Sequence, residues 1–302
     1  MTTLYTHQDS NIRKTWLLMA VFLVIVIALG WFLSYYYNSP AILYFAVIFS
    51  VVMNITSYWF SDKIVLAMYK ARPFKREESE ELWDIVENLS ITAGLPMPRI
   101  FIIDDPAPNA FATGRDKEHA VVAVTTGLRG MLNKQELEGV IAHELSHIGN
   151  RDMLISTVIV VLAGFVTILS DIFLRGSFRG GNNREGGRAQ AIVMIAGLVL
   201  AILAPIIATL IRLAISRKRE FLADASGSLL TRYPEGLANA LRKISSYQGP
   251  MIRANNATAH LFISNPFGPK AMGGLNKLFM THPPLQERIE ALLGKSDSGI
   301  LK

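Results

Sequence analysis

The sequence predicts a mainly α membrane protein with a small α+β soluble domain and four transmembrane helices arranged in two hairpins. The first observation is the composition: 51% of the 302 residues are hydrophobic, 18% are charged, and the mean hydropathy is +0.32. These values are too apolar for an ordinary soluble domain. The second observation is that four long apolar runs occur in two pairs. The third is that short β-branched runs and capped helices follow the first pair, as in a soluble domain.

The first pair of apolar runs covers residues 15–37 and 41–60. The first run, "TWLLMAVFLVIVIALGWFLSYYY", carries no charge and is long enough to cross a bilayer core of ~30 Å. It is longer than the apolar segment of a signal peptide. Only Asn38, Ser39 and Pro40 separate it from the second run, so we expect a tight hairpin.

Basic residues flank this hairpin, whereas its connecting turn has no charge. The flanking residues are Arg13 and Lys14 before it, and Lys63, Lys70, Arg72, Lys75 and Arg76 after it. By the positive-inside rule, both ends of the hairpin are expected in the cytoplasm. The net charge of +6 therefore fits an interaction with lipid headgroups, and nucleic acid is the less favoured partner.

From residue 73 the composition becomes that of a soluble domain. The stretch "EESEELWDIVENLSITAG" has acids in its first turn and Gly94 after its last, which predicts a capped helix of about four turns. The stretches "PRIFIIDD" and "EHAVVAVTTG" are short and rich in β-branched residues. They predict two strands joined by the turn-rich loop "PAPNAFATGRDK".

The stretch "AHELSHIGNRD" contains two histidines four residues apart, with a glutamate directly after the first. Asn133 and Glu136 form a capping-box pattern and Gly149 occupies a C-cap position, so the helix is expected over roughly residues 134–148. Residues i and i+4 share a helix face, so the two imidazoles can bind one metal ion. The glutamate lies about 100° around the helix and can take a proton from a metal-bound water.

The alternative interpretation is an ordinary helix with incidental histidines, because this pattern arises by chance in roughly one chain in a hundred. The uncharged neighbours Ala142, Leu145, Ser146 and Ile148 suit a buried metal-binding face and favour a zinc site. A catalytic zinc site needs a third protein ligand. The sequence has no cysteine, so that ligand must be a histidine or a carboxylate.

Carboxylates with suitable spacing occur in "SRKREFLADASG", where Glu220 and Asp224 are four residues apart. On a helix, one of them can bind the metal while the other holds a ligand imidazole in place. A solvated acidic face after a basic cluster explains the same pattern. The residues by themselves leave both interpretations open.

The second pair of apolar runs covers residues 153–174 and 191–211, and encloses "RGSFRGGNNREGGRAQ". This composition predicts a flexible loop, with RNA contact less favoured. Its four arginines against one glutamate are an excess that the positive-inside rule disfavours outside the cell. Helices buried against protein are the alternative, because that setting accommodates Ser170, Asp171 and Pro205 more easily than lipid. We expect membrane crossing, because each run holds roughly 20 apolar residues.

Taken together, these motifs resemble the HtpX family of membrane-bound zinc metalloproteases, which is related to the CAAX prenyl proteases. H-E-x-x-H, a membrane hairpin and "EFLAD" occur together, with "PNAFATG" upstream and "THPPLQERI" near the C-terminal end. The resemblance extends from the first hairpin to about residue 292. It implies that the soluble part is a small α+β zincin-like (gluzincin) catalytic domain.

The resemblance also implies the roles of the polar residues. His143, His147 and Glu220 would bind one Zn²⁺ per chain, and Glu144 would be the general base. Asp224 matches the acid that orients a zinc-bound histidine in this family.

The resemblance places the substrate cleft at residues 109–114, where an edge strand can pair with an extended peptide. The cleft residues it implies are Asn109, Ala110, Phe111 and Ala112. His282, in the "HPP" motif, would lie near the zinc as a further catalytic residue, although a turn histidine before two prolines is the alternative. His7, His119 and His260 match no motif and are expected on the surface.

The expected domain organisation has four parts. They are residues 1–72, the N-terminal transmembrane hairpin and its flanks; residues 73–152, the first part of the catalytic domain with the H-E-x-x-H helix; residues 153–211, the second transmembrane hairpin; and residues 212–302, the second part of the catalytic domain with the third zinc ligand.

The expected function is that of a multi-pass zinc metalloendopeptidase of the cell membrane with a cytoplasmic active site. The resemblance implies quality control as its role, with misfolded or unfolded membrane proteins and the lipid bilayer as partners and no nucleic acid. A prenyl-protein (CAAX-type) endopeptidase is one alternative. A non-catalytic metal-binding membrane scaffold is another, which the intact Glu144 disfavours.

Overall fold

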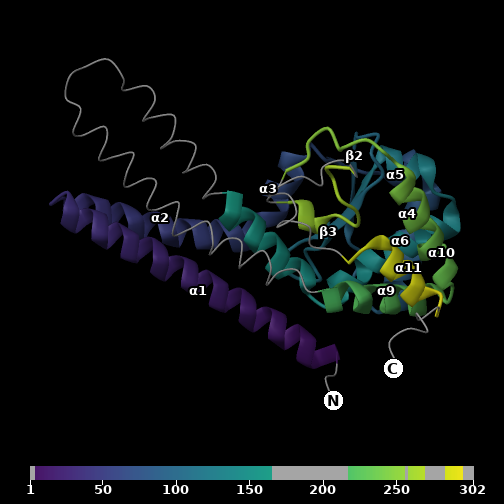
Figure 1. Ribbon diagram of the computed structural model, residues 1–302, viewed down its shortest axis with the longest axis horizontal. Coiled ribbons are helices and arrows are strands. Elements are labelled where there is room, and N and C mark those ends of the chain that lie inside the picture. Colours follow the sequence, from purple (N-terminus) through teal and green to yellow (C-terminus); the bar gives the residue numbers. More distant parts are fainter. Residues whose placement is uncertain (1–3, 165–216, 256–257, 269–282, 295–302) are drawn as a thin grey trace, which may run out of the picture.

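The computed structural model describes residues 4–164, 217–255, 258–268 and 283–294. Figure 1 shows a rod of long helices at one side and a globular part, built from a small sheet and several helices, at the other. In the rod, helix α1 (Leu4–Tyr36) lies beside helix α2 (Pro40–Trp59). Asn38 takes a left-handed conformation in the turn between them, and Pro40 begins α2, where its fixed φ suits a helix start.

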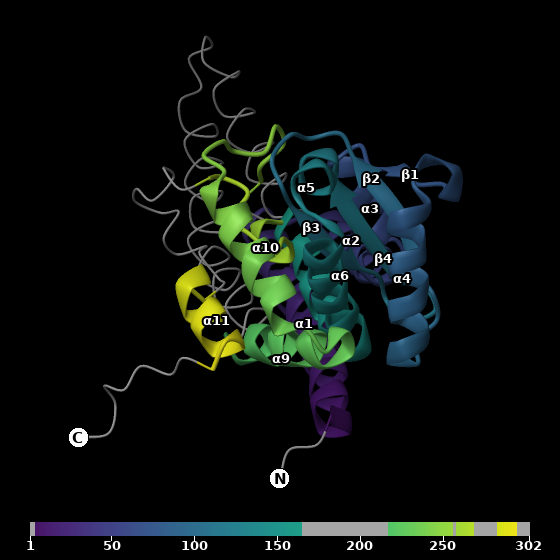
Figure 2. The same cartoon turned by 90° about the vertical axis from the view of Figure 1, so that its right-hand side faces the viewer.

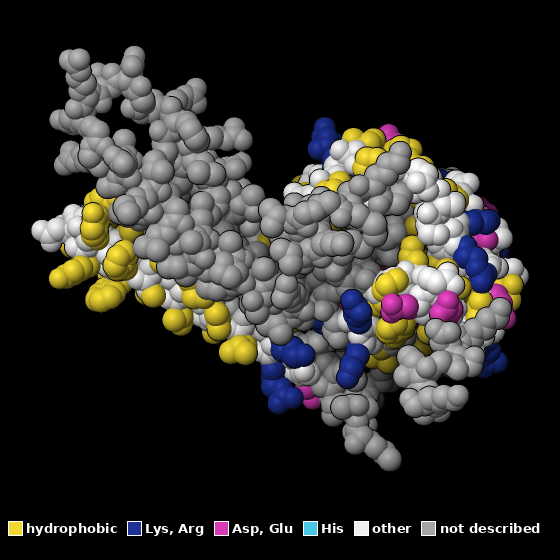
Figure 3. Space-filling model, viewed as in Figure 1, with side chains coloured by type: hydrophobic (Ala, Val, Ile, Leu, Met, Phe, Trp, Pro, Cys, Tyr) yellow, Lys and Arg dark blue, Asp and Glu magenta, His cyan; other side chains and the backbone are white. Residues whose placement is uncertain are grey.

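Both predicted helices of the first hairpin are confirmed as candidate membrane spans by length and composition. Helix α1 extends beyond the predicted apolar run, since it begins at Leu4 and its polar first turns precede residue 15. Figure 3 shows hydrophobic side chains along the rod, and Lys and Arg side chains near the end of α1 that lies beside the globular part.

The second predicted hairpin falls largely outside the described residues. The described part of the run 153–174 belongs to a helix, Asp152–Gly164. This helix is long enough to be part of a membrane span only together with the helix Lys134–Gly149, from which it is bent by 83°. Leu154, Ile155 and Val158 of this helix pack against Leu18 and Phe22 of α1. The remainder of that run and the whole of residues 191–211 are not described.

Between the hairpin and the sheet, α3 (Ser61–Met68), β1 (Arg72–Pro73), the 3₁₀ helix η1 (Arg76–Glu78) and α4 (Glu80–Ala93) follow in order. The predicted capped helix is confirmed as α4. Its N-cap Ser79 accepts a hydrogen bond from the Leu82 amide, and Gly94 ends it in the left-handed conformation with φ 63°.

The sheet contains four strands in the order β1-β2-β4-β3. The two predicted strands are confirmed as β2 (Arg99–Ile103) and β4 (Val121–Thr125), and they pair in parallel. The turn-rich loop predicted between them contains β3 (Ala110–Thr113), antiparallel to β4 and at the edge of the sheet, where the family resemblance implied an edge strand. All four β3 residues are buried, so the strand lacks the alternation of apolar and polar residues that marks a half-exposed strand.

Both faces of the sheet are covered. On one face α4 and α6 (Lys134–Gly149) pack against Ile100, Val122 and Val124. On the other face, α3, Val160 of the helix Asp152–Gly164 and the side chains of Met251, Leu261 and Phe262 pack around Phe111. The remaining elements are α5 (Thr126–Met131), α9 (Arg217–Thr231), α10 (Pro234–Ser246), η2 (Ala259–Leu261) and α11 (Leu285–Leu292). Figure 2 shows α6 between α4 and α10, with α9 across its end.

The predicted capping box of α6 is confirmed, because Asn133 and Glu136 exchange side-chain to backbone hydrogen bonds. The C-terminal prediction is off by one residue: the helix runs through Gly149 and its C-cap is Asn150. The left-handed residue is Arg151, with φ 57°, because the chain turns there into the next helix.

Candidate metal centre

Helix α6 places three polar side chains in the middle of the globular part. His143 and Glu144 are each 1% exposed, and His147 is half-buried. The neighbouring Ala142, Leu145 and Ile148 are fully buried, so α6 is surrounded by protein on nearly all sides. A buried polar group is costly unless it has partners.

Helix α9 supplies those partners through Glu220 and Asp224, both buried one turn apart. It approaches α6 closely at Gly227, where an added Cβ would lie 3.0 Å from the backbone nitrogen of His143. The glycine therefore permits the spacing that brings the two acids to the two histidines.

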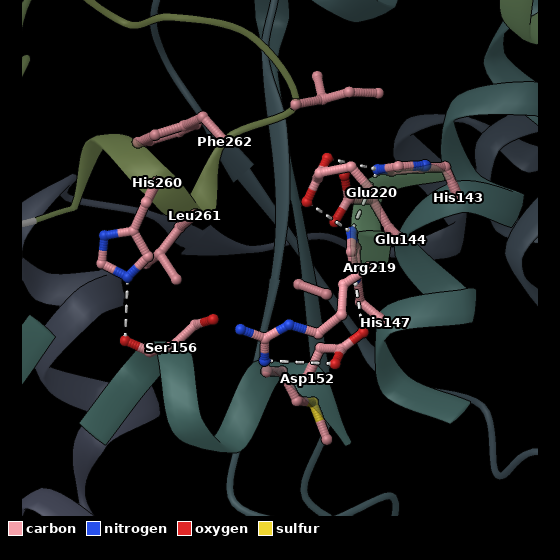
Figure 4. Close-up of a pocket in the computed structure, with 13 residues that line it drawn as sticks. His143, Glu144, His147, Asp152, Ser156, Arg219, Glu220, His260, Leu261 and Phe262 are labelled. Atoms are coloured by element: carbon pink, nitrogen blue, oxygen red, sulfur yellow. Dashed lines mark hydrogen bonds and ion pairs between the residues drawn. The ribbon is translucent and has the colours of Figure 1, made fainter. Parts of the chain in front are cut away.

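The three predicted metal ligands come together at one point, as Figure 4 shows. The Nε2 atoms of His143 and His147 are 3.2 Å apart. Glu220 places Oε2 at 3.8 Å from the first Nε2 and Oε1 at 3.7 Å from the second. Four-coordinate zinc with bonds of ~2.0–2.1 Å separates neighbouring donor atoms by roughly 3.4 Å, so the donor set and its spacing fit a zinc ion.

His143 is held by Asp224, whose Oδ1 lies 2.9 Å from the imidazole Nδ1. The same carboxylate accepts hydrogen bonds from Nε and Nη2 of Arg288 at 2.8 and 2.6 Å. Arg288 is fully buried, and sequence reasoning assigned it no role. A signal existed, because Leu285, Arg288 and Ile289 share one helix face and Arg288 alone of the three is charged.

His147 is held by a different acid. Its Nδ1 lies 3.2 Å from Oδ2 of Asp152, and Oδ1 of Asp152 accepts a 2.7 Å hydrogen bond from the side chain of Asn11. Sequence reasoning assigned no role to Asp152 or Asn11. Asp152 follows the end of α6, so helix periodicity does not connect it to the histidine.

The ionisation of these groups depends on their surroundings. Burial raises the pKa of Glu144 to about 7, near the value that suits a general base at neutral pH. Burial lowers the pKa of His143 to about 4, which keeps this imidazole neutral. Burial also lowers the pKa of His147, but the hydrogen bond to Asp152 and the charge of Glu220 outweigh it and raise the pKa to about 9.

A pocket opens onto these residues, lined also by Ala112, Ser156, His260 and Phe262 (Figure 4). The prediction that His260 lies on the surface is wrong: it is 6% exposed, and its Nε2 lies 3.2 Å from the Ser156 carbonyl. The reason is that η2 packs against the helix Asp152–Gly164. His119 is exposed as predicted. His282 and the side chain of His7 lie outside the described residues.

Of the four predicted cleft residues, only Ala112 lines the pocket. It lies beside Glu144, and its backbone N–H donates to the Glu144 carboxylate. Phe111 points to the opposite face of the sheet and packs against Phe262. Ala110 begins β3 and Asn109 directly precedes it, where residues 263–264 run alongside.

The contacts between these two segments are specific. The Ala110 carbonyl accepts a hydrogen bond from the Ile263 N–H at 3.1 Å. The Asn109 side chain donates to the Ser264 carbonyl at 3.0 Å and accepts from its N–H at 3.2 Å. The chain itself therefore occupies this part of the β3 edge.

Comparison with known proteins identifies relatives along nearly the whole chain. Residues 76–296 match the model of peptidase family M48. "Protease HtpX homolog" proteins from Caldanaerobacter subterraneus subsp. tengcongensis and Thermoanaerobacter pseudethanolicus are 47% and 49% identical, each over 96% of this chain and 97% of the relative. A solved structure of S. mikatae Ste24p is similar with a TM-score of 0.50 at 20% identity, over 95% of this chain and 67% of that chain. This last likeness shows a shared fold.

Proposed function

Because this chain belongs to peptidase family M48 and is a membrane metalloendopeptidase of the HtpX type, we propose that it uses one zinc ion to cleave misfolded membrane proteins. His143, His147 and Glu220 hold the ion. The observation that carries this assignment is the meeting of the two imidazole Nε2 atoms, 3.2 Å apart, with the Glu220 carboxylate, whose two oxygens lie 3.8 and 3.7 Å from them in a buried site. Histidine and glutamate without cysteine form a donor set that suits catalytic zinc.

A bound zinc supplies Lewis-acid polarisation of the scissile carbonyl and of a water molecule. Glu144 takes the proton of the attacking water and passes it to the leaving amine. Its pKa of about 7 allows both transfers near neutral pH. Asp224 and Asp152 each accept from the Nδ1 of one histidine, which turns both Nε2 atoms toward Glu220.

The position of the site supports membrane proteins as substrates. Asn11 lies four residues before the apolar run of α1 and contacts Asp152 beside the metal ligands. At 1.5 Å per residue, four residues of helix span roughly 6 Å, so the site lies close to the membrane surface. The basic flanks of the first hairpin favour the cytoplasmic side for that surface.

An extended substrate segment pairs with β3 near Ala112, in this proposal. The Ala110 carbonyl already accepts from Ile263, so the pairing begins at the end of β3 beside Glu144. A strand-like segment can pair in this way only where the substrate is unfolded. This requirement favours damaged over folded proteins.

The test compares the purified, zinc-loaded protein with Glu144→Gln on a loosely folded membrane protein. We expect Glu144→Gln to keep its metal and fold and to lose about 10³-fold in cleavage rate, because only the proton acceptor is removed. Glu138→Gln, a half-buried residue on the same helix, is the matched control and should cleave like the wild type.

Near wild-type cleavage by Glu144→Gln would refute the mechanism. A prenylated peptide in a parallel reaction separates the substrate classes. Cleavage of that peptide alone would contradict the quality-control assignment and leave the metal chemistry intact.

A further inference from the structure

Asn11 is a buried polar residue on the first membrane helix, 5% exposed. Its side-chain amide donates to Oδ1 of Asp152 at 2.7 Å and to the Asn150 carbonyl at 3.1 Å. Its side-chain oxygen lies 3.5 Å from Nη1 of Arg219 on α9. An NH₂ group has two donor hydrogens, and the two acceptors account for both.

These contacts lie directly behind a metal ligand. Asp152 accepts from Asn11 with one carboxylate oxygen, while its other oxygen lies 3.2 Å from Nδ1 of His147. The Asp152 side chain is 7% exposed and also pairs with Arg219 at 3.6 Å. A carboxylate fixed on one side by donors can fix an imidazole on the other.

The two histidines are therefore supported from different parts of the molecule. Asp224 and Arg288, both on helices of the globular part, support His143. His147 is supported from the turn after α6, where the chain bends by 83° and Arg151 is left-handed. Asn11 contacts residues on both sides of Arg151, so it links this turn to α1.

We propose that Asn11 is a positioning residue of the metal centre: the first membrane helix orients the His147 imidazole through Asp152. The inference rests on the proposed metal site. It gives α1 a role beyond anchoring, and it accounts for the continuation of this helix through polar residues before its apolar run. The metal centre is complete only when α1 is docked.

The test measures zinc affinity in the full-length protein in lipid bilayers. Asn11→Leu keeps a similar volume and removes both donors, and Asn11→Asp keeps the shape but turns a carboxylate toward Asp152. We expect each to weaken zinc binding about 10-fold, the lower end of the range for residues that support a metal ligand. Arg13→Ala, an exposed residue on the same helix, is the control and should bind like the wild type.

A double-mutant cycle with Asp152→Asn distinguishes positioning from a general structural effect. If Asn11 acts through Asp152, Asn11→Leu should add little to the loss already caused by Asp152→Asn. An additive loss, or unchanged zinc affinity in both Asn11 variants, would overturn the inference. Failure of the wild type to bind zinc would instead refute the proposed metal site, so the two failures are distinguishable.

Discussion

At the scale of single residues, the Asp224 carboxylate supports two groups at once. It accepts from His143 and from the fully buried Arg288. Burial raises the pKa of Asp224, but the charge of Arg288 outweighs this and lowers the pKa below its usual value. Asp224 therefore stays ionised, and in the proposed metal site it serves both metal binding and folding.

This double role predicts different defects for the two acids of α9. Glu220→Ala should lower zinc affinity far more than Asp224→Asn, for which a loss of roughly 10 to 100-fold is expected. Asp224→Ala should also destabilise the fold by about 3–5 kcal/mol, because it removes the closest partner of a buried arginine. Zinc titration and denaturant unfolding separate the two effects. The reverse order of zinc affinities would show that the roles of the two acids are exchanged.

A second residue-scale prediction follows from His147, whose pKa of about 9 in the metal-free fold lies above the usual ~6.5. At pH values between about 6.5 and 9, the folded, metal-free protein keeps a proton on this imidazole. That proton must leave before a metal binds. We expect zinc binding at pH 7 to release about one proton from His147, and the apparent affinity to rise up to about pH 9. Calorimetry in two buffers of different ionisation enthalpy measures this release.

Asp152→Asn is the comparison for that experiment. The hydrogen bond to Asp152 is the foremost of the contacts that raise the pKa of His147. Its weakening should lower that pKa, so the proton release should fall off at a lower pH than in the wild type. The same pH dependence of release in both proteins would contradict the assignment.

At the scale of elements, the spacing of α9 and α6 determines whether the ligands meet. Gly227→Ala would put a Cβ 3.0 Å from the backbone of His143, so the helices must separate by a few tenths of an ångström. We expect a loss of about 1–3 kcal/mol in unfolding free energy, as for overpacking, together with weaker zinc binding. Denaturant unfolding and zinc titration measure both.

Gly130→Ala in α5 provides the matched control, because a Cβ there meets nothing within 4 Å. It should leave zinc affinity unchanged and stabilise the fold slightly through helix propensity. If both variants behave alike, the close approach at Gly227 does not set the helix spacing.

At the scale of the whole molecule, the membrane topology sets where the active site lies. The apolar runs 153–174 and 191–211 lie largely outside the described residues, and from their length and composition we predict that they cross the membrane between His147 and Glu220. The sequence has no cysteine, so one introduced at Ser177 is a unique label. An impermeant thiol reagent should label it in intact cells. Labelling only after lysis, with a matched cytoplasmic control, would show that the hairpin does not cross.

Features that depend on residues close together in the chain could be predicted before the structure was known. The first hairpin follows from two apolar runs, the capping box of α6 from Asn133 and Glu136, and the juxtaposition of His143 with His147 from helix periodicity. The position of Glu220 and Asp224 on one face of a helix follows in the same way. Each pattern repeats within one or two helical turns, where backbone geometry alone places the side chains.

The distant residues that support those ligands could be identified only from the packing of the folded chain. Arg288 reaches Asp224 across 64 positions, and Asn11 reaches Asp152 across 141. The burial of His260 likewise depends on a segment that packs over it. No local periodicity encodes such contacts, because they form when α1, α6, α9 and α11 bury their surfaces together and each enclosed polar group must find a partner.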